Sequence, residues 1–210
     1  MRHTILTLVA LIGLQAWAWA QSPGAVMLRS GAESFPENLN EFVAASGQVS
    51  DAVAGRYYRL VQFHETPIQS VRQEMEQQGL RFLDYIPHAT YLVSFPENFD
   101  RYQLSNFPVR AIMPMNSLHK VSHLLTDASL PDWAVHGNLI DLTISFQKDL
   151  PGNMVARQLR SMGLKVLSSP TMNHTMDVQA PINQIYYLAD LSFISWVEPI
   201  THPGEPEDDE

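Results

Sequence analysis

Residues 81–95, RFLDYIPHATYLVSF, contain two apolar runs, each of a length that suits a β-strand. The runs are separated by residues 86–89, IPHA, where proline and histidine interrupt the pattern. Two strands joined by so short a break form an antiparallel hairpin. We therefore expect a hairpin here, and the segments on either side of it decide the fold.

Strands and helices are predicted on both sides of this hairpin. Residues 57–63, YYRLVQF, have the pattern of a strand, and a helix is expected to begin at Thr66 and Pro67 and to end at Gly79. A short helix over 97–105 and a strand over 109–113 follow the hairpin. This order is that of a ferredoxin-like (βαββαβ) sandwich, an antiparallel four-stranded sheet with two helices on one face.

The same order of elements returns in the second half of the chain. Gly163 ends a helical pattern 84 residues after Gly79, and Pro199 follows a strand 85 residues after Pro114. Nearly constant offsets favour two copies of one unit over a chance likeness, so we expect an α+β chain with two tandem ferredoxin-like sandwiches. The second set comprises a strand at 139–146, a helix over 155–162, a hairpin from 164–167 to 175–178, a helix over 182–189 and a strand at 193–197.

The first twenty residues have the pattern of a signal peptide. Arg2 precedes an apolar run over 5–14, and the small residues Ala18 and Ala20 place the cleavage before Gln21. About ten apolar residues are too few to span a bilayer. We therefore expect a secreted or periplasmic protein with no membrane contact after signal removal.

The remaining chain divides at changes of composition. Turn residues mark a linker between the two units, and acidic residues dominate the last segment. The expected boundaries are a signal peptide at 1–20, a spacer with one short helix at 21–55, a first unit at 56–122, a linker at 123–137, a second unit at 138–200 and an acidic tail at 201–210.

Composition excludes several classes of function. The formal net charge of -9 argues against a nucleic-acid partner and against an anionic membrane surface, since both attract basic proteins. The chain has no cysteine, which excludes thiol catalysis, thiolate metal sites and a disulfide framework. Its stability must come from packing.

Motifs for catalysis and cofactor binding are not found in the sequence. It has no GxSxG turn for a serine nucleophile and no glycine-rich anion loop after the strand at 57–63. His119 and His123 would share one face of a helix, as in zinc sites, but a third ligand is not evident, and surface histidines are the alternative. We expect no catalytic residue, no metal and no cofactor.

The chain resembles the fervidolysin-like prodomain, the N-terminal propeptide of secreted bacterial subtilisin-like serine proteases. The resemblance is carried by YYRLVQF at 57–63, QQGLRFLDYIPHATYLVSF at 77–95, VRAIMPMNSLHKVS at 109–122 and FISWVEPI at 193–200, with a looser likeness at 26–39. It covers roughly residues 56–200 and includes no catalytic signature.

The resemblance implies an intramolecular chaperone and temporary inhibitor whose partner is a subtilisin-like protease domain. The propeptide sheet of that family packs on the protease, and its tail lies in the substrate cleft. Asp84, Tyr85 and Tyr91 are the expected docking residues on the exposed face of the sheet, with Phe82 and Leu92 in the core. The segment expected in the protease cleft comprises Ile200, Thr201, His202, Pro203 and Gly204.

Three readings of the function stay open. The catalytic Asp, His and Ser of the protease are not in this chain, so it should hydrolyse nothing by itself. It would act in cis as the propeptide of a longer precursor, or in trans as a free-standing inhibitor or chaperone. A non-catalytic binding module of the cell envelope is the alternative from another class.

Overall fold

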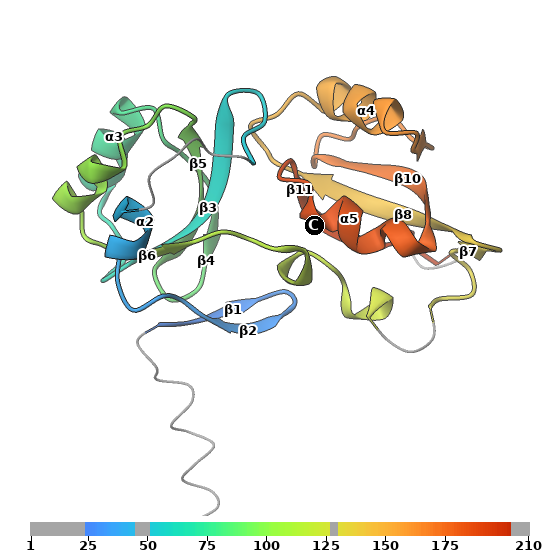
Figure 1. Ribbon diagram of the computed structural model, residues 1–210, viewed down its shortest axis with the longest axis horizontal. Helices are drawn as coiled ribbons and strands as arrows, with labels where there is room; N and C mark the ends of the chain where they lie inside the picture. Colours follow the sequence, from blue (N-terminus) through green and yellow to red (C-terminus); the bar gives the residue numbers. More distant parts are fainter. Residues whose placement is uncertain (1–23, 45–50, 127–129, 203–210) are drawn as a thin grey trace, which may run out of the picture.

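The computed structural model describes residues 24–44, 51–126 and 130–202. It is an α+β structure with antiparallel sheets, as the sequence predicts at that level. Two lobes are joined by a linker (Figure 1). We call the elements from β1 to β6 the first lobe and those from β7 to β11 the second lobe.

The sheet of the first lobe has four antiparallel strands in the order β4-β5-β3-β6. The hairpin predicted from residues 81–95 is confirmed as β4 and β5. His88 and Ala89 make its turn with φ of 65° and 53°, a left-handed conformation that suits a tight hairpin. The strands are β3 (Arg56–Phe63), β4 (Arg81–Ile86), β5 (Thr90–Pro96) and β6 (Val109–Met113).

The helices of the first lobe are shorter than the sequence predicts. Helix α3 (Gln69–Gln77) begins after an extended Ile68, which is later than the expected start at Thr66. A 3-10 helix, η2 (Arg101–Asn106), replaces most of the helix expected over 97–105. The carboxylate of Asp100 accepts a hydrogen bond from the Tyr102 amide and so sets the start of η2. These helices, together with α2 (Asn40–Ala44), lie on the side of the sheet away from the second lobe (Figure 1).

The second lobe repeats this order of strands. Its sheet runs β11-β8-β10-β9, so in both lobes the first strand of the sheet lies between the third and the fourth. A short strand, β7 (Val135–His136), pairs with the start of β8. The other elements are β8 (Leu139–Phe146), α4 (Gly152–Ser161), β9 (Lys165–Val166), β10 (Thr175–Pro181), η5 (Ile182–Gln184), α5 (Ile185–Asp190) and β11 (Ile194–Pro199).

A second hairpin, which the sequence did not predict, precedes the first sheet. It consists of β1 (Ala25–Leu28) and β2 (Gly31–Ser34), in a segment where only a spacer with one helix was expected. Val26 and Leu28 are buried in the same apolar cluster as Leu60 and Leu92 of the first sheet. The hairpin therefore belongs to the packed structure of the first lobe.

The two sheets differ in how many of their faces are buried. In β5 six consecutive residues are buried, and in β3 buried residues occupy both faces. In β8 and β10 buried residues alternate strictly with half-exposed ones. The central strands β3 and β5 of the first sheet are therefore covered on both sides, while its edge strand β4 stays partly exposed. The second sheet is covered by its helices on one side.

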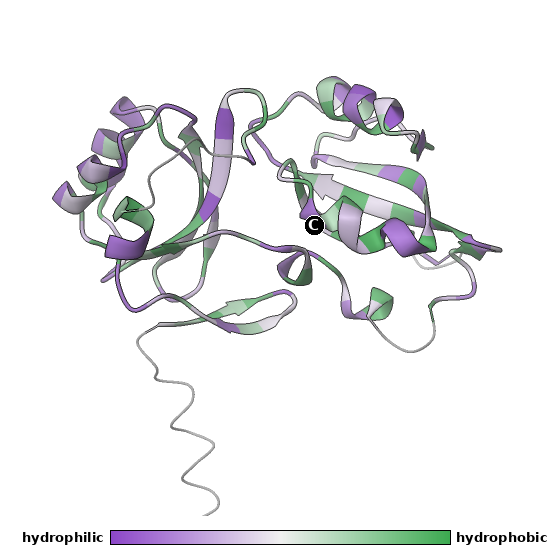
Figure 2. Cartoon of the chain, viewed as in Figure 1, coloured by the Kyte–Doolittle hydropathy of each residue, from purple (hydrophilic) through white to green (hydrophobic). Residues whose placement is uncertain are grey.

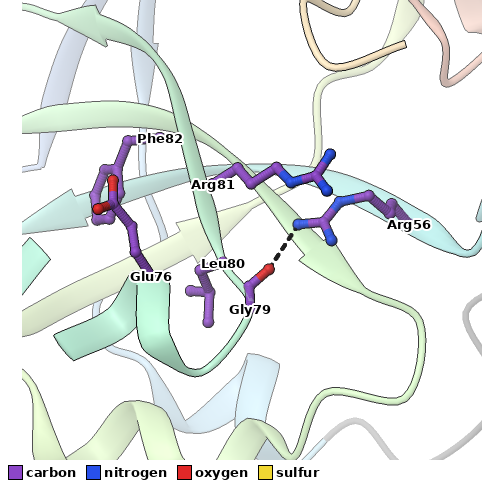
Figure 3. A pocket seen from close by; sticks show the side chains of 6 residues that line it. All are labelled: Arg56, Glu76, Gly79, Leu80, Arg81 and Phe82. Atoms are coloured by element: carbon purple, nitrogen blue, oxygen red, sulfur yellow. Dashed lines mark hydrogen bonds between the residues drawn. The ribbon is translucent and has the colours of Figure 1, made fainter. Parts of the chain in front are cut away.

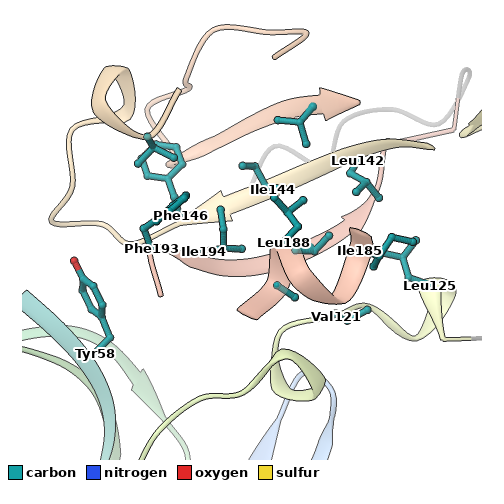
Figure 4. Close-up of a cluster of buried hydrophobic side chains, with 14 of the residues drawn as sticks. Tyr58, Val121, Leu125, Leu142, Ile144, Phe146, Ile185, Leu188, Phe193 and Ile194 are labelled. Atoms are coloured by element: carbon teal, nitrogen blue, oxygen red, sulfur yellow. The ribbon is translucent and has the colours of Figure 1, made fainter. Parts of the chain in front are cut away.

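Two apolar clusters account for this difference. One lies between the first sheet and its helices and includes Tyr57, Val61 and Phe95. The other begins on the opposite face of the first sheet at Tyr58 and continues into the second lobe around Phe146 (Figure 4). Along β8 and β10 hydrophobic segments alternate with hydrophilic ones, while α3 is largely hydrophilic (Figure 2).

The segment that follows β6 and leads to β7, which we call the linker, packs on the second lobe. It begins earlier than the linker expected at 123–137. Two 3-10 turns, η3 (Ser117–His119) and η4 (His123–Leu125), flank a short extended stretch. Val121 forms a parallel bridge with Val197, and the Val197 amide donates to the Lys120 carbonyl at 2.8 Å. The linker thus covers the outer edge of β11.

Replacing Gly79 by alanine is expected to cost more stability than replacing Gly163. Both end a helix in the predicted left-handed conformation, with φ of 93° and 84°. A left-handed alanine costs about 1–2 kcal/mol at either position. At position 79 the added Cβ would also lie 3.0 Å from Cγ of Pro96, whereas at 163 it meets nothing within 4 Å. Urea unfolding of both variants checks the order, and equal losses would contradict it.

Candidate functional site

A buried carboxylate joins the two lobes. Asp149 lies in the loop between β8 and α4, and its side chain is 7% exposed. Within the described residues, its polar side-chain partners all come from strands of the first sheet, so the second lobe inserts a charge into the face of the first. Tyr58 Oη donates to Oδ1 at 2.9 Å, Ser94 Oγ donates to Oδ2 at 2.7 Å, and Arg56 Nε and Arg81 Nη1 lie 3.3 Å and 3.4 Å from Oδ2.

The first lobe holds Arg56 in place independently of Asp149. The Arg56 guanidinium donates to the Gly79 carbonyl at 2.8 Å and to the Ser94 carbonyl at 2.9 Å. Burial, followed by the neighbouring Arg81, lowers the pKa of Arg56 from its usual value. Burial and then the Asp149 carboxylate raise the pKa of Tyr58, which keeps its hydroxyl as a donor. We call Arg56, Tyr58, Arg81 and Ser94 the carboxylate seat.

A solvent-open recess lies beside the carboxylate seat. It has a volume of about 470 Å³, and Arg56, Gly79 and Arg81 line it. Figure 3 shows the two guanidinium groups side by side at its edge, with Arg56 bonded to Gly79. Arg81 is half exposed, so solvent reaches the positive side of the seat.

A larger cleft of about 790 Å³ separates the lobes. Its walls include Met27, Tyr85 and Met172, which are all exposed and come from three different parts of the chain. The Arg29 guanidinium lies 5.6 Å above the Trp196 ring at the same cleft. The Tyr85 ring lies 5.1 Å from the Tyr91 ring on the other face of the sheet, so Met27 and Met172 are the exposed apolar side chains at the cleft. Exposed apolar side chains from both lobes at one cleft are typical of a surface that contacts another molecule.

The open face of the second sheet is polar. Thr143 of β8 lies at its centre, between Asp177 of β10 and Glu198 of β11. Its hydroxyl donates to Asp177 at 2.8 Å, and the Gln179 amide donates to Asp141 at 2.7 Å. These side chains are half exposed, and the hydrogen bonds link neighbouring strands across this face.

The three expected docking residues do not share one exposed face. Tyr85 is 57% exposed, and Asp84 lines the cleft, where it forms an ion pair with Lys148 of the second lobe. Tyr91 is only 7% exposed, so its expected exposure was wrong. It packs edge-on against Phe82, because both faces of β5 are covered.

The expected protease-cleft segment begins as an extension of the second sheet. The Ile200 amide donates to the Asp141 carbonyl at 3.2 Å, and its carbonyl accepts from Trp133 Nε1 at 2.9 Å. Thr201 and His202 are exposed, and the His202 ring lies 5.0 Å from the Trp133 ring. Pro203 and Gly204 lie outside the described residues, as do Ala18, Ala20 and Gln21 of the expected signal cleavage site.

Comparison with known proteins gives one family. Residues 27–116 match the model of a domain of unknown function (DUF8729). The match begins within β1 and ends three residues after β6, so it follows the first lobe, including its β1–β2 hairpin. No curated protein and no solved structure matches the chain.

His119 and His123 lie on separate 3-10 turns, so they do not share a helix face. Nδ1 of the buried His119 accepts from the Asn116 amide at 3.3 Å, and its Nε2 lies 3.4 Å from Glu33. Within residues 24–44, 51–126 and 130–202, no group of three or more His, Cys, Asp or Glu side chains could hold a metal ion. In the same residues no helix is both long and apolar enough to cross a bilayer.

Lys120 is a buried cation on the linker. It is 2% exposed, and its ammonium donates to the Leu191 carbonyl at 3.1 Å. Burial lowers its pKa to about 8, although the carboxylates of Asp190 and Asp51 act in the opposite direction. The folded chain therefore holds this proton less firmly than an exposed lysine would.

Sequence reasoning missed the carboxylate seat. Asp149 lies between Lys148 and Leu150 in a stretch that has the composition of an ordinary turn, and its partners lie 55 to 93 positions earlier in the chain. Arg56 and Arg81 each begin a strand next to apolar residues, which could have suggested a buried anionic partner. Nothing in the sequence identifies which carboxylate that is.

Proposed function

We propose that this chain is a non-catalytic protein that binds another polypeptide, as the propeptide region of a subtilisin-like serine protease. It would assist the folding of the protease and inhibit it temporarily, either in cis within a longer precursor or in trans. The proposal includes two ferredoxin-like units. The equal strand orders of the two sheets and the likeness of 56–200 to secreted propeptides support it.

The observation that carries the proposal is the open face of the second sheet. A propeptide needs one broad uncovered sheet surface. The central strands β3 and β5 of the first sheet offer none, because hairpin β1–β2 and the second lobe cover one face and the helices cover the other. The second sheet presents Thr143 and its polar neighbours. We therefore assign docking to the second unit and a supporting role to the first.

The position of the tail supports the same assignment. Ile200 follows directly from β11, an outer strand of the open sheet. A partner docked on that face would lie beside the segment that begins at Thr201. Large domains with many non-local contacts fold slowly, and a preformed surface that binds the near-native state speeds their folding.

Purified residues 21–210 are expected to inhibit a subtilisin-like protease with tight-binding kinetics. Thr143→Arg places a long cation at the centre of the docking face and should raise the inhibition constant about tenfold or more. Thr66→Arg, an equal change at an exposed site of the first lobe, should leave it unchanged. If the wild-type chain neither slows several such enzymes nor aids their refolding, the proposal fails.

A binding module of the cell envelope is the second candidate. The cleft favours it, because the exposed Met27 and Met172 offer an adaptable apolar surface without any need for a protease. Under this candidate Thr143→Arg would have no effect, whereas Met172→Ala would weaken retention of the chain on isolated envelopes.

A further inference from the structure

Asp149 occupies the carboxylate seat as a ligand occupies a binding site. Each of its polar partners belongs to the first lobe, whereas Asp149 itself belongs to the second. Both carboxylate oxygens are satisfied, one by Tyr58 and the other by Ser94 and the two arginines. The polar contact of Asp149 is therefore a contact between the two lobes, in which the second lobe supplies the carboxylate and the first supplies its partners.

Two residues of the carboxylate seat are held within the first lobe without its occupant. Arg56 is bonded to the Gly79 and Ser94 carbonyls, and Ser94 Oγ also accepts from Arg56 Nε at 2.6 Å. The recess beside Arg56 and Arg81 lets water or another anion approach. The seat can thus release one carboxylate and accept another without being rebuilt.

The ionic contacts between the lobes contribute a modest part of the stability of the closed form. A buried ion pair gains little over its hydrated components, because desolvation offsets the attraction. The exposed pair between Lys148 and Asp84 contributes little for the same reason and is screened by salt. The apolar cluster that continues across the junction opposes opening, so an open form would be a minor population.

We propose that Asp149 is a releasable latch that holds the two lobes closed. When another carboxylate takes the seat, the lobes separate, and the face of the first sheet around Tyr58 becomes available. The idea that a partner polypeptide supplies this carboxylate rests on the proposed function. The latch itself does not depend on the proposed function.

The absence of cysteine makes the latch measurable. Gln73→Cys in α3 and Arg157→Cys in α4 place one exposed spin label on each lobe for distance measurement by pulsed electron paramagnetic resonance. In Asp149→Asn the longer-distance population should rise about tenfold. Asp141→Asn is the matched control, because that carboxylate bonds to His136 and Gln179 of its own lobe. Tyr58→Phe removes one donor and should give a smaller rise.

Three outcomes would overturn the proposal. An unchanged distance distribution in Asp149→Asn shows that the contact does not hold the lobes. Loss of cooperative unfolding in Asp149→Asn, together with an unchanged distribution in Tyr58→Phe, shows a structural role only. Sodium acetate should raise the longer-distance population of the wild-type chain above that in sodium chloride of equal ionic strength, and equal effects rule out displacement by a carboxylate.

Discussion

Phe95→Ala is expected to lower the free energy of unfolding by about 3–5 kcal/mol, the usual cost of emptying a large aromatic site. Phe95 is fully buried, and its ring stacks on Tyr57 at a centroid distance of 5.1 Å. It also contacts Phe42 and Phe99, so the cavity would open among three rings that cannot all move into it. A loss of this size is a large part of the stability of a small domain.

Urea unfolding followed by two probes measures this effect. The tryptophans of residues 21–210 are Trp133 and Trp196. Because Arg29 lies over the Trp196 ring, their fluorescence reports on the second lobe and on its contact with the first, while far-ultraviolet circular dichroism reports on the whole chain. Tyr102→Ala is the control, because Tyr102 is 71% exposed and should change stability little. A loss below about 1 kcal/mol for Phe95→Ala would show that the site collapses freely.

Lys120→Met is expected to change how stability depends on pH. The unfolded chain keeps the lysine proton up to about pH 10.5, whereas the folded chain releases it near pH 8. Between these values the unfolded state binds more protons, so the stability of the wild-type chain rises with pH. From about pH 8 to pH 10.5, the free energy of unfolding of the wild-type chain should rise by roughly 3 kcal/mol more than that of Lys120→Met, since each pKa unit corresponds to about 1.4 kcal/mol.

Urea unfolding of both chains at neutral pH and near pH 10.5 gives this difference directly, because every other titrating group is common to them. Lys165→Met is the matched control for the loss of a lysine, at an exposed position of β9. Parallel pH profiles of the wild-type chain and Lys120→Met would show that burial does not disfavour the charged lysine.

The order of strands and helices could be predicted because each element leaves a local signal. Alternation over 139–146 gives β8 with its exact bounds, and the helix-ending role of Gly79 and Gly163 follows from a conformation that glycine adopts at little cost. The helix expected over 97–105 became η2 instead, since the Asp100 cap starts it later.

Other features of the fold could not be predicted because tertiary contacts decide them. The strands β1 and β2 have four residues each, too few to show a period, and burial against the first sheet stabilises them. Tyr91 alternates with Leu92, but alternation cannot show that both faces of β5 are covered. Exposure was therefore assigned to the wrong residue.

The polar face of the second sheet and the carboxylate seat also differ in how far the sequence predicts them. The polar face around Thr143 follows from the alternation of β8, so its residues are visible in the sequence. The carboxylate seat brings Asp149 to Tyr58 and Ser94, which depends on how two separate units pack together. No local pattern records that packing.

The edges of the second sheet have a consequence for aggregation. An unpaired strand edge can add strands from other molecules and start a fibril. Here residues 120–122 cover β11, and β9 at the opposite edge has only two residues. Neither edge offers a long template, so this sheet can keep one broad face in contact with solvent at high concentration without growing into cross-β assemblies.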